Sequence, residues 1–502
     1  VKANVNWTAV SDQPWLAVQY NDSSVTLTAE PNPLDTIRKA NVIVSAAGFD
    51  PQIIDITQAA APRRVTAGNL SNVLTTNELN SLTEIALMGT IDARDFKTMR
   101  ESMPKLTDID LLATDIVAYE GQNCSPFGGT NVVKYPANEV PEQIFYYSNK
   151  LKTIILPQST KSIGKNAFYQ SALSMVSFSN SISSVGAYAF GSCKNLSSLT
   201  LPDSLKTIRE YAFSECTNLS GRVVFPPSVK VISNSAFSGC SGLTGELIIP
   251  STVDTLGNYA FNGCYQLTTV SIRSANTLIG DGVFTGCWWL TKVNIPSGLT
   301  SISNNLFTNC MRLEQFEFPS GLKSIGNEAF LRTGLSVVSF PATLNSIGAS
   351  SFSGTNIAAL TIPSTLTTIG KNAFSDCTEL KSVELPSTLK SIPNGLFSGC
   401  KGLNAIEFPA GLQTIGDAAF SGCTSLVNVN LPSLITSVAT YTFSGCTGLQ
   451  SVNFPTSLTS IGSNAFANCT GLTSLSFPDQ LKTIGYAAFS GCSRLSSASL
   501  PP

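Results

Sequence analysis

Residues 449–472, LQSVNFPTSLTSIGSNAFANCTGL, contain one complete unit of a pattern that fills most of this chain. The unit opens with a Leu-x-x-Val-x-Phe-Pro stretch whose alternating apolar residues predict a short strand. Pro455 ends this strand because proline cannot donate a further ladder hydrogen bond. Ile461-Gly462 predicts a tight bend, and the following Ala-Phe-x-x-Cys spacing is closer to one helical or 3₁₀ turn. Gly471 then supplies the backbone freedom for the chain to turn back into the next unit.

The phenylalanine of this unit recurs along the last two-thirds of the chain at steps of 22, 23 or 24 residues. A period in this range, sustained over so many copies, predicts stacked repeat units rather than one globular core. One unit has too few apolar residues to bury its own face, so stacking must place Phe on Phe, Leu on Leu and Ile on Ile. The repeating residues are Phe168, Phe190, Phe213, Phe237, Phe261, Phe284, Phe307, Phe330, Phe352, Phe374, Phe397, Phe420, Phe443, Phe466 and Phe489.

The spacing Leu-x-x-Leu-x-Leu, as at Leu196, Leu199 and Leu201, resembles the leucine-rich repeat. With the added Ile-Gly-x-x-Ala-Phe-x-x-Cys of the quoted unit, the pattern is similar to the BspA-like subfamily of bacterial surface proteins over roughly residues 145–502. The resemblance implies a leucine-rich repeat solenoid with coils of about 23 residues, a parallel sheet and short 3₁₀ or helical turns. An extra unit beginning at Phe145 brings the expected number to about 16 coils.

Residues 1–60 lack the repeat and show alternating apolar residues between turn signals, which predicts a small all-β sandwich. Its most distinctive segments are Asn6-Trp7-Thr8, Pro14-Trp15-Leu16, Arg38-Lys39-Ala40-Asn41-Val42 and Ile56-Thr57-Gln58. These segments resemble the BACON domain, which is frequent in extracellular proteins of Bacteroidetes and associated with carbohydrate-active or mucin-contacting chains. The resemblance implies either a sugar-binding module or a spacer. Trp7 and Trp15 accordingly serve either the core or sugar stacking.

Residues 61–68 predict a short linker, because proline and glycine punctuate them. Residues 69–144 resemble the N-terminal cap of BspA-like solenoids, which prevents the first coil from exposing an apolar face. Within this cap the pattern predicts a helix over residues 71–81 and a strand over residues 85–91. Asp92 is then expected to cap a second helix.

The composition excludes several kinds of chemistry. The chain has no histidine, which removes Ser-His-Asp and Cys-His catalysis and the commonest zinc sites. Charged residues make up 12% of the chain and the net charge is −2, so nucleic acid is not an expected partner. No apolar stretch has membrane-spanning length, and the start at Val1 without a signal-like segment indicates a mature or trimmed form. We therefore expect that this chain is not an enzyme and that it binds no cofactor and no metal.

Most of the 13 cysteines follow a repeat phenylalanine by three residues. Ser171, Thr333 and Thr355 occupy the same position in other units, so the position requires a small side chain. We expect buried free thiols there rather than disulfides or a metal site, because stacked parallel side chains fit the disulfide dihedral poorly and the spacing is unlike that of metal ligands. Cys124 lies in an irregular, Gly-rich stretch and is the one thiol expected to be accessible.

Three carboxylates interrupt a strip of hydroxyl and amide side chains on the strand face that is expected to line the solenoid surface. They are Glu317, Glu384 and Glu407. Glu384 and Glu407 belong to adjacent coils and are either a weak acid/base pair or ordinary solvated carboxylates. An open strip does not desolvate them, which favours the second interpretation.

Five large side chains occupy positions where most units have small or polar residues, on three consecutive coils. They are Tyr265, Trp288, Trp289, Met311 and Arg312, which we call the aromatic cluster. Either one tryptophan folds inward and the rest lie flat on the surface, or the cluster is a ligand contact, or it serves packing between molecules. The turn that carries the cluster is polar in other units, so we predict that both indoles are exposed near the strand edge.

Other irregularities occur at two glycines and at the C-terminus. Gly221 and Gly245 each lengthen a coil by one residue, which predicts a bulge. Leu495, Ala498 and Leu500 still follow the repeat up to Pro501-Pro502, so this sequence ends on an uncapped coil. We expect either that the natural chain continues or that this coil associates with another molecule.

Two functions agree with these features. The first is a cell-surface or secreted adhesin, a binding scaffold that presents an extended solenoid surface to host extracellular proteins or other cells, as the BspA-like resemblance implies. The alternative is a glycan- or mucin-binding capture protein without catalytic activity, which the BACON resemblance and the aromatic cluster favour. Both place the chain outside the cell or at its surface, and a lipid anchor on the full-length precursor is one means of attachment.

Overall fold

The computed structural model describes residues 7–21, 24–33, 38–58, 61–122, 124 and 132–499 of this 502-residue chain. The chain divides into two compact units, Val1–Ile182 and Ser183–Pro502. The sequence expectations for Val5, Asn6 and Leu500–Pro502 lie outside the described residues.

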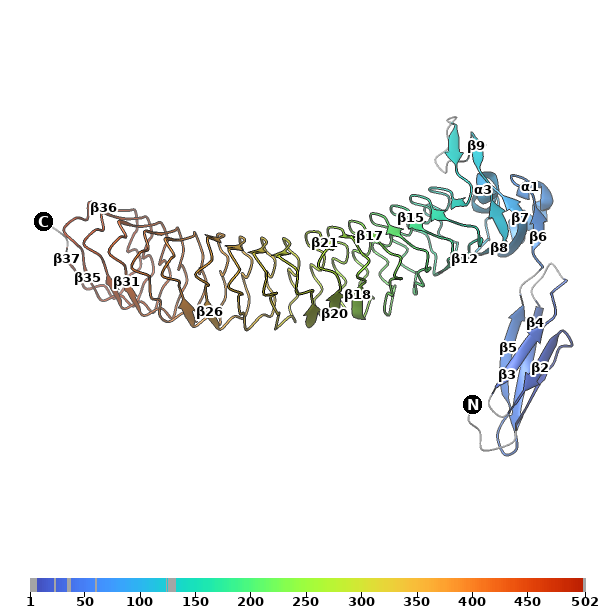
Figure 1. The fold of residues 1–502 in the computed structure, drawn as a ribbon, viewed down its shortest axis with the longest axis horizontal. Helices are drawn as coiled ribbons and strands as arrows, with labels where there is room; N and C mark the ends of the chain where they lie inside the picture. Colours follow the sequence, from blue (N-terminus) through green and yellow to red (C-terminus); the bar gives the residue numbers. More distant parts are fainter. Residues whose placement is uncertain are drawn as a thin grey trace. The chain divides into compact units, whose positions relative to one another are not determined.

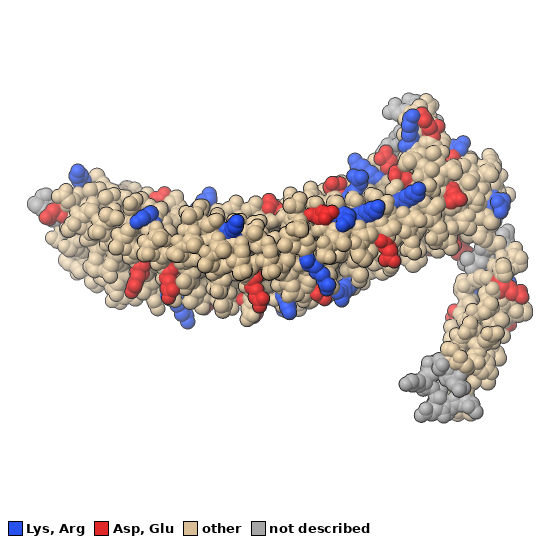
Figure 2. Space-filling model, viewed as in Figure 1, with Lys and Arg blue, Asp and Glu red and all other residues tan. Residues whose placement is uncertain are grey.

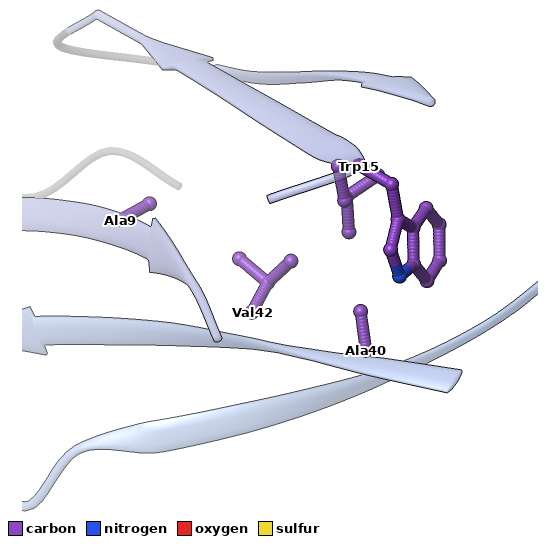
Figure 3. Close-up of a cluster of buried hydrophobic side chains, with 5 residues drawn as sticks. Ala9, Trp15, Ala40 and Val42 are labelled. Carbon is purple, nitrogen blue, oxygen red and sulfur yellow. The ribbon is translucent and has the colours of Figure 1, made fainter. Parts of the chain in front are cut away.

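The N-terminal strands form two antiparallel sheets, of order β1-β4-β5 and β2-β3. Trp15 is 7% exposed and packs with Ala40 and Val42 between them, as Figure 3 shows. The guanidinium of Arg38 lies 4.2 Å from the centre of the Trp15 ring. Trp15 therefore serves the core, and Trp7 is partly buried against the same cluster. The strands are β1 (Trp7–Ser11), β2 (Leu16–Tyr20), β3 (Val25–Ala29), β4 (Arg38–Ala46) and β5 (Gln52–Gln58).

The next segment combines short helices with a parallel sheet of order β14-β12-β8-β7-β6. The helix expected over residues 71–81 is two helices, because Thr75 opens a new capping box. Asp92 caps α3 as predicted. Residues 63–65 of the predicted linker form β6, which pairs with β7 and so belongs to the folded cap. The elements are β6 (Arg63–Val65), α1 (Leu70–Val73), α2 (Thr76–Ser81), β7 (Glu84–Ile91), α3 (Ala93–Glu101), β8 (Asp108–Ile116), β9 (Tyr119–Gly121) and β10 (Val133–Tyr135).

Glu78 should make the N-terminal end of α2 sensitive to acid. Its carboxylate accepts a hydrogen bond from the backbone N–H of Thr75 (2.8 Å) and lies 2.7 Å from Arg63. These contacts, led by the Thr75 N–H, lower the pKa of Glu78 from 4.5 to about 2. Because the folded-state pKa lies below the ordinary value, the ionised carboxylate stabilises α2 above about pH 5, and this stabilisation is lost as the pH falls towards 2.

We therefore expect Glu78→Gln to speed hydrogen exchange in α2 at pH 6, by the loss of about 1 kcal/mol of local stability. The difference between wild type and variant should shrink as the pH falls towards 2, when each pair is compared at the same pH. A difference that is the same at pH 6 and pH 2 would show that the carboxylate charge is not the cause.

The solenoid contains two kinds of strand, front and back, and where two adjacent coils both form one of these strands the pair is parallel, as in β31 with β33 and β34 with β36. Figure 1 shows the coils stacked one on another. The front strands come from the Leu-x-x-Val-x-Phe stretch: β12 (Thr153–Ile155), β14 (Met175–Ser177), β18 (Gly245–Ile249), β20 (Leu267–Ile272), β22 (Lys292–Asn294), β26 (Ala359–Thr361), β28 (Ser382–Glu384), β31 (Asn428–Asn430), β33 (Ser451–Asn453), β35 (Ser474–Ser476) and β37 (Ser497–Ser499). The predicted leucine-rich repeat solenoid with parallel sheets is thereby confirmed.

The back strands are two residues each and were missed, because Ile461-Gly462 was expected to form only a bend. In the structure Ile461 ends β34, which pairs with β32 and β36. The back strands are β11 (Glu139–Val140), β13 (Ser162–Ile163), β15 (Ser184–Val185), β16 (Thr207–Ile208), β17 (Val231–Ile232), β19 (Thr255–Leu256), β21 (Leu278–Ile279), β23 (Ser301–Ile302), β24 (Ser324–Ile325), β25 (Ser346–Ile347), β27 (Thr368–Ile369), β29 (Ser391–Ile392), β30 (Thr414–Ile415), β32 (Ser437–Val438), β34 (Ser460–Ile461) and β36 (Thr483–Ile484).

The Ala-Phe segment forms tight turns, as expected, with the N–H of Cys469 donating to the carbonyl of Phe466 three residues earlier (3.2 Å), and it also joins the coils by a third hydrogen-bond ladder. Asn464 and Asn468 have left-handed backbone, with φ of 55° and 58°. With these two residues in the left-handed conformation, the N–H of Phe466, which lies between them, points at the carbonyl of Ala488 in the next coil (2.8 Å). Gly471 has no such positive φ, so the expected reason for this glycine was wrong. A Cβ there would lie 2.7 Å from the Leu449 carbonyl oxygen, so close approach of the neighbouring coil requires the glycine.

From Phe190 to Phe489 the phenylalanines form the continuous interior stack that the repeat predicts. Phe330 and Phe352 have ring centres 5.2 Å apart, and Phe352 and Phe374 have centres 5.4 Å apart, with nearly parallel planes in both pairs. All three side chains are fully buried. The thiols explain the position that follows, because each donates to a phenylalanine carbonyl of the preceding coil, as Cys400 does to Phe374 (3.1 Å). A small side chain with a weak donor satisfies that carbonyl in the interior.

The expectation that Cys124 is the accessible thiol was wrong. Its side chain is 2% exposed in a cluster with Ala93 and Tyr135, and burial raises its pKa. All 13 cysteines are free, and Cys492 alone is partly exposed, because within the described residues no coil covers its outer side. We expect a thiol-reactive dye at pH 8.5 to label one cysteine of the native chain quickly, and Cys492→Ser to abolish this phase. Fast labelling of several cysteines would contradict the buried row of thiols.

The insertion at Gly245 is a bulge, as predicted, and the insertion at Gly221 has the same backbone conformation. Gly221 and Gly245 both have φ of +77°, and the pairing of β18 with β20 shifts register between Gly245 and Glu246. Gly221 itself makes an isolated parallel bridge to Leu243. Only glycine adopts this backbone without strain, which explains why the longer coils carry it.

Candidate functional site

The aromatic cluster lies on the turn between the buried cysteine and the front strand of each coil. Tyr265 is 39% exposed, Trp288 44%, Trp289 48% and Met311 56%, and Arg312 is exposed as well. Neither indole folds inward, so that alternative is wrong and both rings stay at the surface.

The backbone that carries the two indoles is held by its neighbours in the sequence and in the preceding coil. Cys287 and Leu290, on either side of the pair, are fully buried. The N–H of Trp288 donates to the carbonyl of Gly286 (2.9 Å), and the N–H of Trp289 donates to that of Tyr265 in the preceding coil (3.1 Å). These two buried anchors leave the side chains of Trp288 and Trp289 no route into the core.

The side chains of the cluster pack on one another across coils. Tyr265 and Trp288 stack with ring centres 4.3 Å apart and planes inclined by 23°. The guanidinium of Arg312 lies 3.7 Å from the centre of the Trp289 ring, in a cation–π contact. One face of each indole is therefore already covered, and the rings are fixed before any ligand arrives. No ion pair joins Arg312 to a carboxylate in the part of the chain that the structure describes.

The three candidate carboxylates belong to three different coils, and the coils of Glu384 and Glu407 are adjacent. Glu317, Glu384 and Glu407 are all exposed. Glu384 accepts a hydrogen bond from the hydroxyl of Thr361 in the preceding coil (3.0 Å). The geometry of these exposed side chains fits solvated surface carboxylates better than an acid/base pair.

An open pocket beside the cluster was missed by the sequence analysis. It is lined by Thr291, Arg312, Glu314 and Gln315 and has a volume of about 330 Å³. These residues come from two adjacent coils and belong to ordinary surface types, so no spacing rule marks them. The one available signal was the run Arg312-Leu313-Glu314-Gln315, which places three large polar groups next to the two indoles.

Charged side chains do not mark out one region on the face of the molecule that Figure 2 shows. Figure 2 shows Lys, Arg, Asp and Glu side chains of both signs scattered among larger uncharged areas on the face in view. Within the described residues, no group of three or more His, Cys, Asp or Glu side chains is placed to hold a metal ion. None of the helices described is long and apolar enough to cross a lipid bilayer.

Two family models match the chain. The model described as the BspA type leucine rich repeat region matches residues 138–268, 244–358, 345–473 and 413–502. The BACON model, described as a putative binding domain, matches residues 5–59. The comparison with curated proteins found no match.

Several solved structures are similar. A leucine-rich repeat protein from Bacteroides ovatus is 28% identical with a TM-score of 0.57, and the match covers 70% of this chain and 88% of that chain. A leucine rich cell surface protein from Faecalibacterium prausnitzii is 21% identical with a TM-score of 0.35, over 65% of this chain and 84% of that chain. A leucine-rich repeat protein from T. pallidum is 30% identical over 36% of this chain and 77% of that chain, with a TM-score of 0.26.

Proposed function

This chain belongs to the BspA-type leucine-rich repeat family, and we propose that it is a cell-surface or secreted adhesin. In this role the solenoid is a binding scaffold without catalytic activity. It presents the aromatic cluster to an extracellular protein of a host or of a neighbouring cell. BspA-type repeats and BACON domains are typical of surface-exposed bacterial proteins, which supports a location outside the cell.

The observation that carries the proposal is the packing of exposed side chains within the cluster. Trp, Tyr, Met and Arg are enriched at the centres of protein interfaces, and truncation of such residues dominates binding energy. Here Tyr265 holds Trp288, and Arg312 holds Trp289, while all four remain at the surface. A partner therefore meets side chains that have already lost much of their rotamer freedom, which reduces the entropy cost of association.

The same packing favours a protein over a glycan as the ligand of the cluster itself. A sugar that stacks on an indole needs a free ring face, and the contacts with Tyr265 and Arg312 leave at most one such face on Trp288 and one on Trp289. A protein surface can instead contact the exposed ring edges together with Met311 and Tyr265.

Binding to treated host cells tests the proposal. We expect the intact chain to bind epithelial cells and their extracellular matrix. Mild surface proteolysis of the cells should abolish this binding, whereas enzymatic removal of their N- and O-glycans should leave most of it. Binding that survives proteolysis but disappears after deglycosylation would instead establish the glycan-capture alternative.

A further inference from the structure

We propose that the pocket lined by Thr291, Arg312, Glu314 and Gln315 is a binding site for one neutral sugar unit. This site is distinct from the exposed ring edges of the aromatic cluster, although Arg312 belongs to both. The inference does not depend on a protein partner for the cluster.

The pocket lies at one of the places where the front sheet is interrupted. β22 pairs with β20 on one side, and residues 313–318 of the next coil form no strand. In the preceding coil the N–H of Thr291 donates to the carbonyl of Thr268 (2.9 Å). In the following coil the N–H of Ser336 donates to the carbonyl of Glu314 (3.2 Å).

The bond that would continue this series, from the N–H of Glu314 to the carbonyl of Thr291, is absent among the described residues. Thr291 and Glu314, which both line the pocket, are therefore not joined by this backbone hydrogen bond.

The lining side chains select a neutral ligand with both donors and acceptors. Arg312 offers only donors and an ionised Glu314 only acceptors, whereas Gln315 and Thr291 offer both. Neither Arg312 nor Glu314 has an ion-pair partner in the described part of the chain. An anionic ligand would meet the charge of Glu314, and a cationic ligand would meet that of Arg312. Neighbouring hydroxyls of a pyranose supply an acceptor to the guanidinium and a donor to the carboxylate at once.

Size and rigidity agree with a single sugar unit. The volume of about 330 Å³ lies at the lower end of small-molecule pockets, so it suits one ring rather than a long oligosaccharide. The contact with Trp289 fixes the plane of the Arg312 guanidinium 3.7 Å from the ring centre, which orients its N–H groups before binding.

The test uses the intact chain and free monosaccharides. Saturation-transfer NMR would screen galactose, glucose, mannose, fucose, N-acetylglucosamine and N-acetylgalactosamine, with N-acetylneuraminic acid as the anionic comparison. We expect at least one neutral sugar to bind with a Kd in the millimolar range. Glu314→Ala and Gln315→Ala should each weaken this binding at least fivefold.

Two other coils supply matched controls. Gln450 holds the position in its coil that Glu314 holds in the pocket coil, and Asn428 holds the position equivalent to Gln315. Between these two control coils the backbone hydrogen bond is present, from the N–H of Gln450 to the carbonyl of Val427 (2.8 Å). Gln450→Ala and Asn428→Ala should leave sugar binding unchanged. Three results would each overturn the inference: no neutral sugar binds, the two pocket variants bind normally, or N-acetylneuraminic acid binds more tightly than every neutral sugar. Cell binding through the aromatic cluster should persist in Glu314→Ala and Gln315→Ala, so failure of one proposal is distinguishable from failure of the other.

Discussion

Replacing Phe352 with alanine is expected to lower the local stability of the central coils by about 4 kcal/mol. The ring is fully buried between Phe330 and Phe374, with centres 5.2 and 5.4 Å away, and Phe318 and Phe340 approach it edge-on. Truncation removes apolar contact and leaves a cavity that the fixed coils on either side can fill only in part. Native-state hydrogen exchange of residues 330–374 would measure the loss.

The last phenylalanine provides the matched control. Phe489 has the same register but is only partly buried, and it stacks on Phe466 on one side, with ring centres 5.4 Å apart. Each coil of a solenoid is stabilised by its neighbours. Phe489→Ala should therefore lower local stability by less than half as much as Phe352→Ala, and mainly in the last two coils. Equal losses at both positions would contradict a continuous interior stack as the source of stability.

The double substitution Trp288→Ala and Trp289→Ala is expected to weaken attachment to protein ligands or cell surfaces at least tenfold. Truncation of a central interface residue typically costs at least about 2 kcal/mol. The melting temperature should stay nearly unchanged, because both rings are 44–48% exposed and the buried anchors Cys287 and Leu290 remain. Surface plasmon resonance and thermal unfolding of the same protein preparations would measure both quantities.

Two single variants control for general effects of this change. Lys401→Ala changes the residue that holds the position equivalent to Trp288 in another coil. Tyr486→Ala removes an aromatic ring that is 84% exposed. Neither should change binding by more than about twofold, since neither belongs to the aromatic cluster. If the double variant melts well below the parent and still binds normally, the two tryptophans are structural and the contact lies elsewhere.

The sequence predicted the interior of the solenoid well, because burial of that interior is repeated in every coil. The step from Phe330 to Phe352 to Phe374 fixes which residues stack, and the thiol-sized position beside them follows from the same repeat. The cap of α3 at Asp92 was also predictable, since an N-terminal cap depends on residues that are close in the sequence.

The features that were missed depend on contacts between coils. A back strand such as Ser460–Ile461 has two residues, too few to show any alternation, and is a strand only because its neighbours pair with it. Cys124 is buried by Tyr135 and Ala93, which no local pattern places beside it. The exposure of Trp288 was predictable from the polar residues of other units, whereas the pocket between Thr291 and Glu314 was not.

Footprinting of the chain in complex with its ligand tests the central claim most directly. Hydroxyl-radical labelling followed by mass spectrometry would compare the free chain with the chain bound to the most tightly binding protein from a panel of purified extracellular matrix proteins. The account predicts strong protection of Trp288, Trp289 and Met311, and no protection of Tyr486. Unchanged labelling of Trp288 and Trp289 in a saturated complex would contradict it.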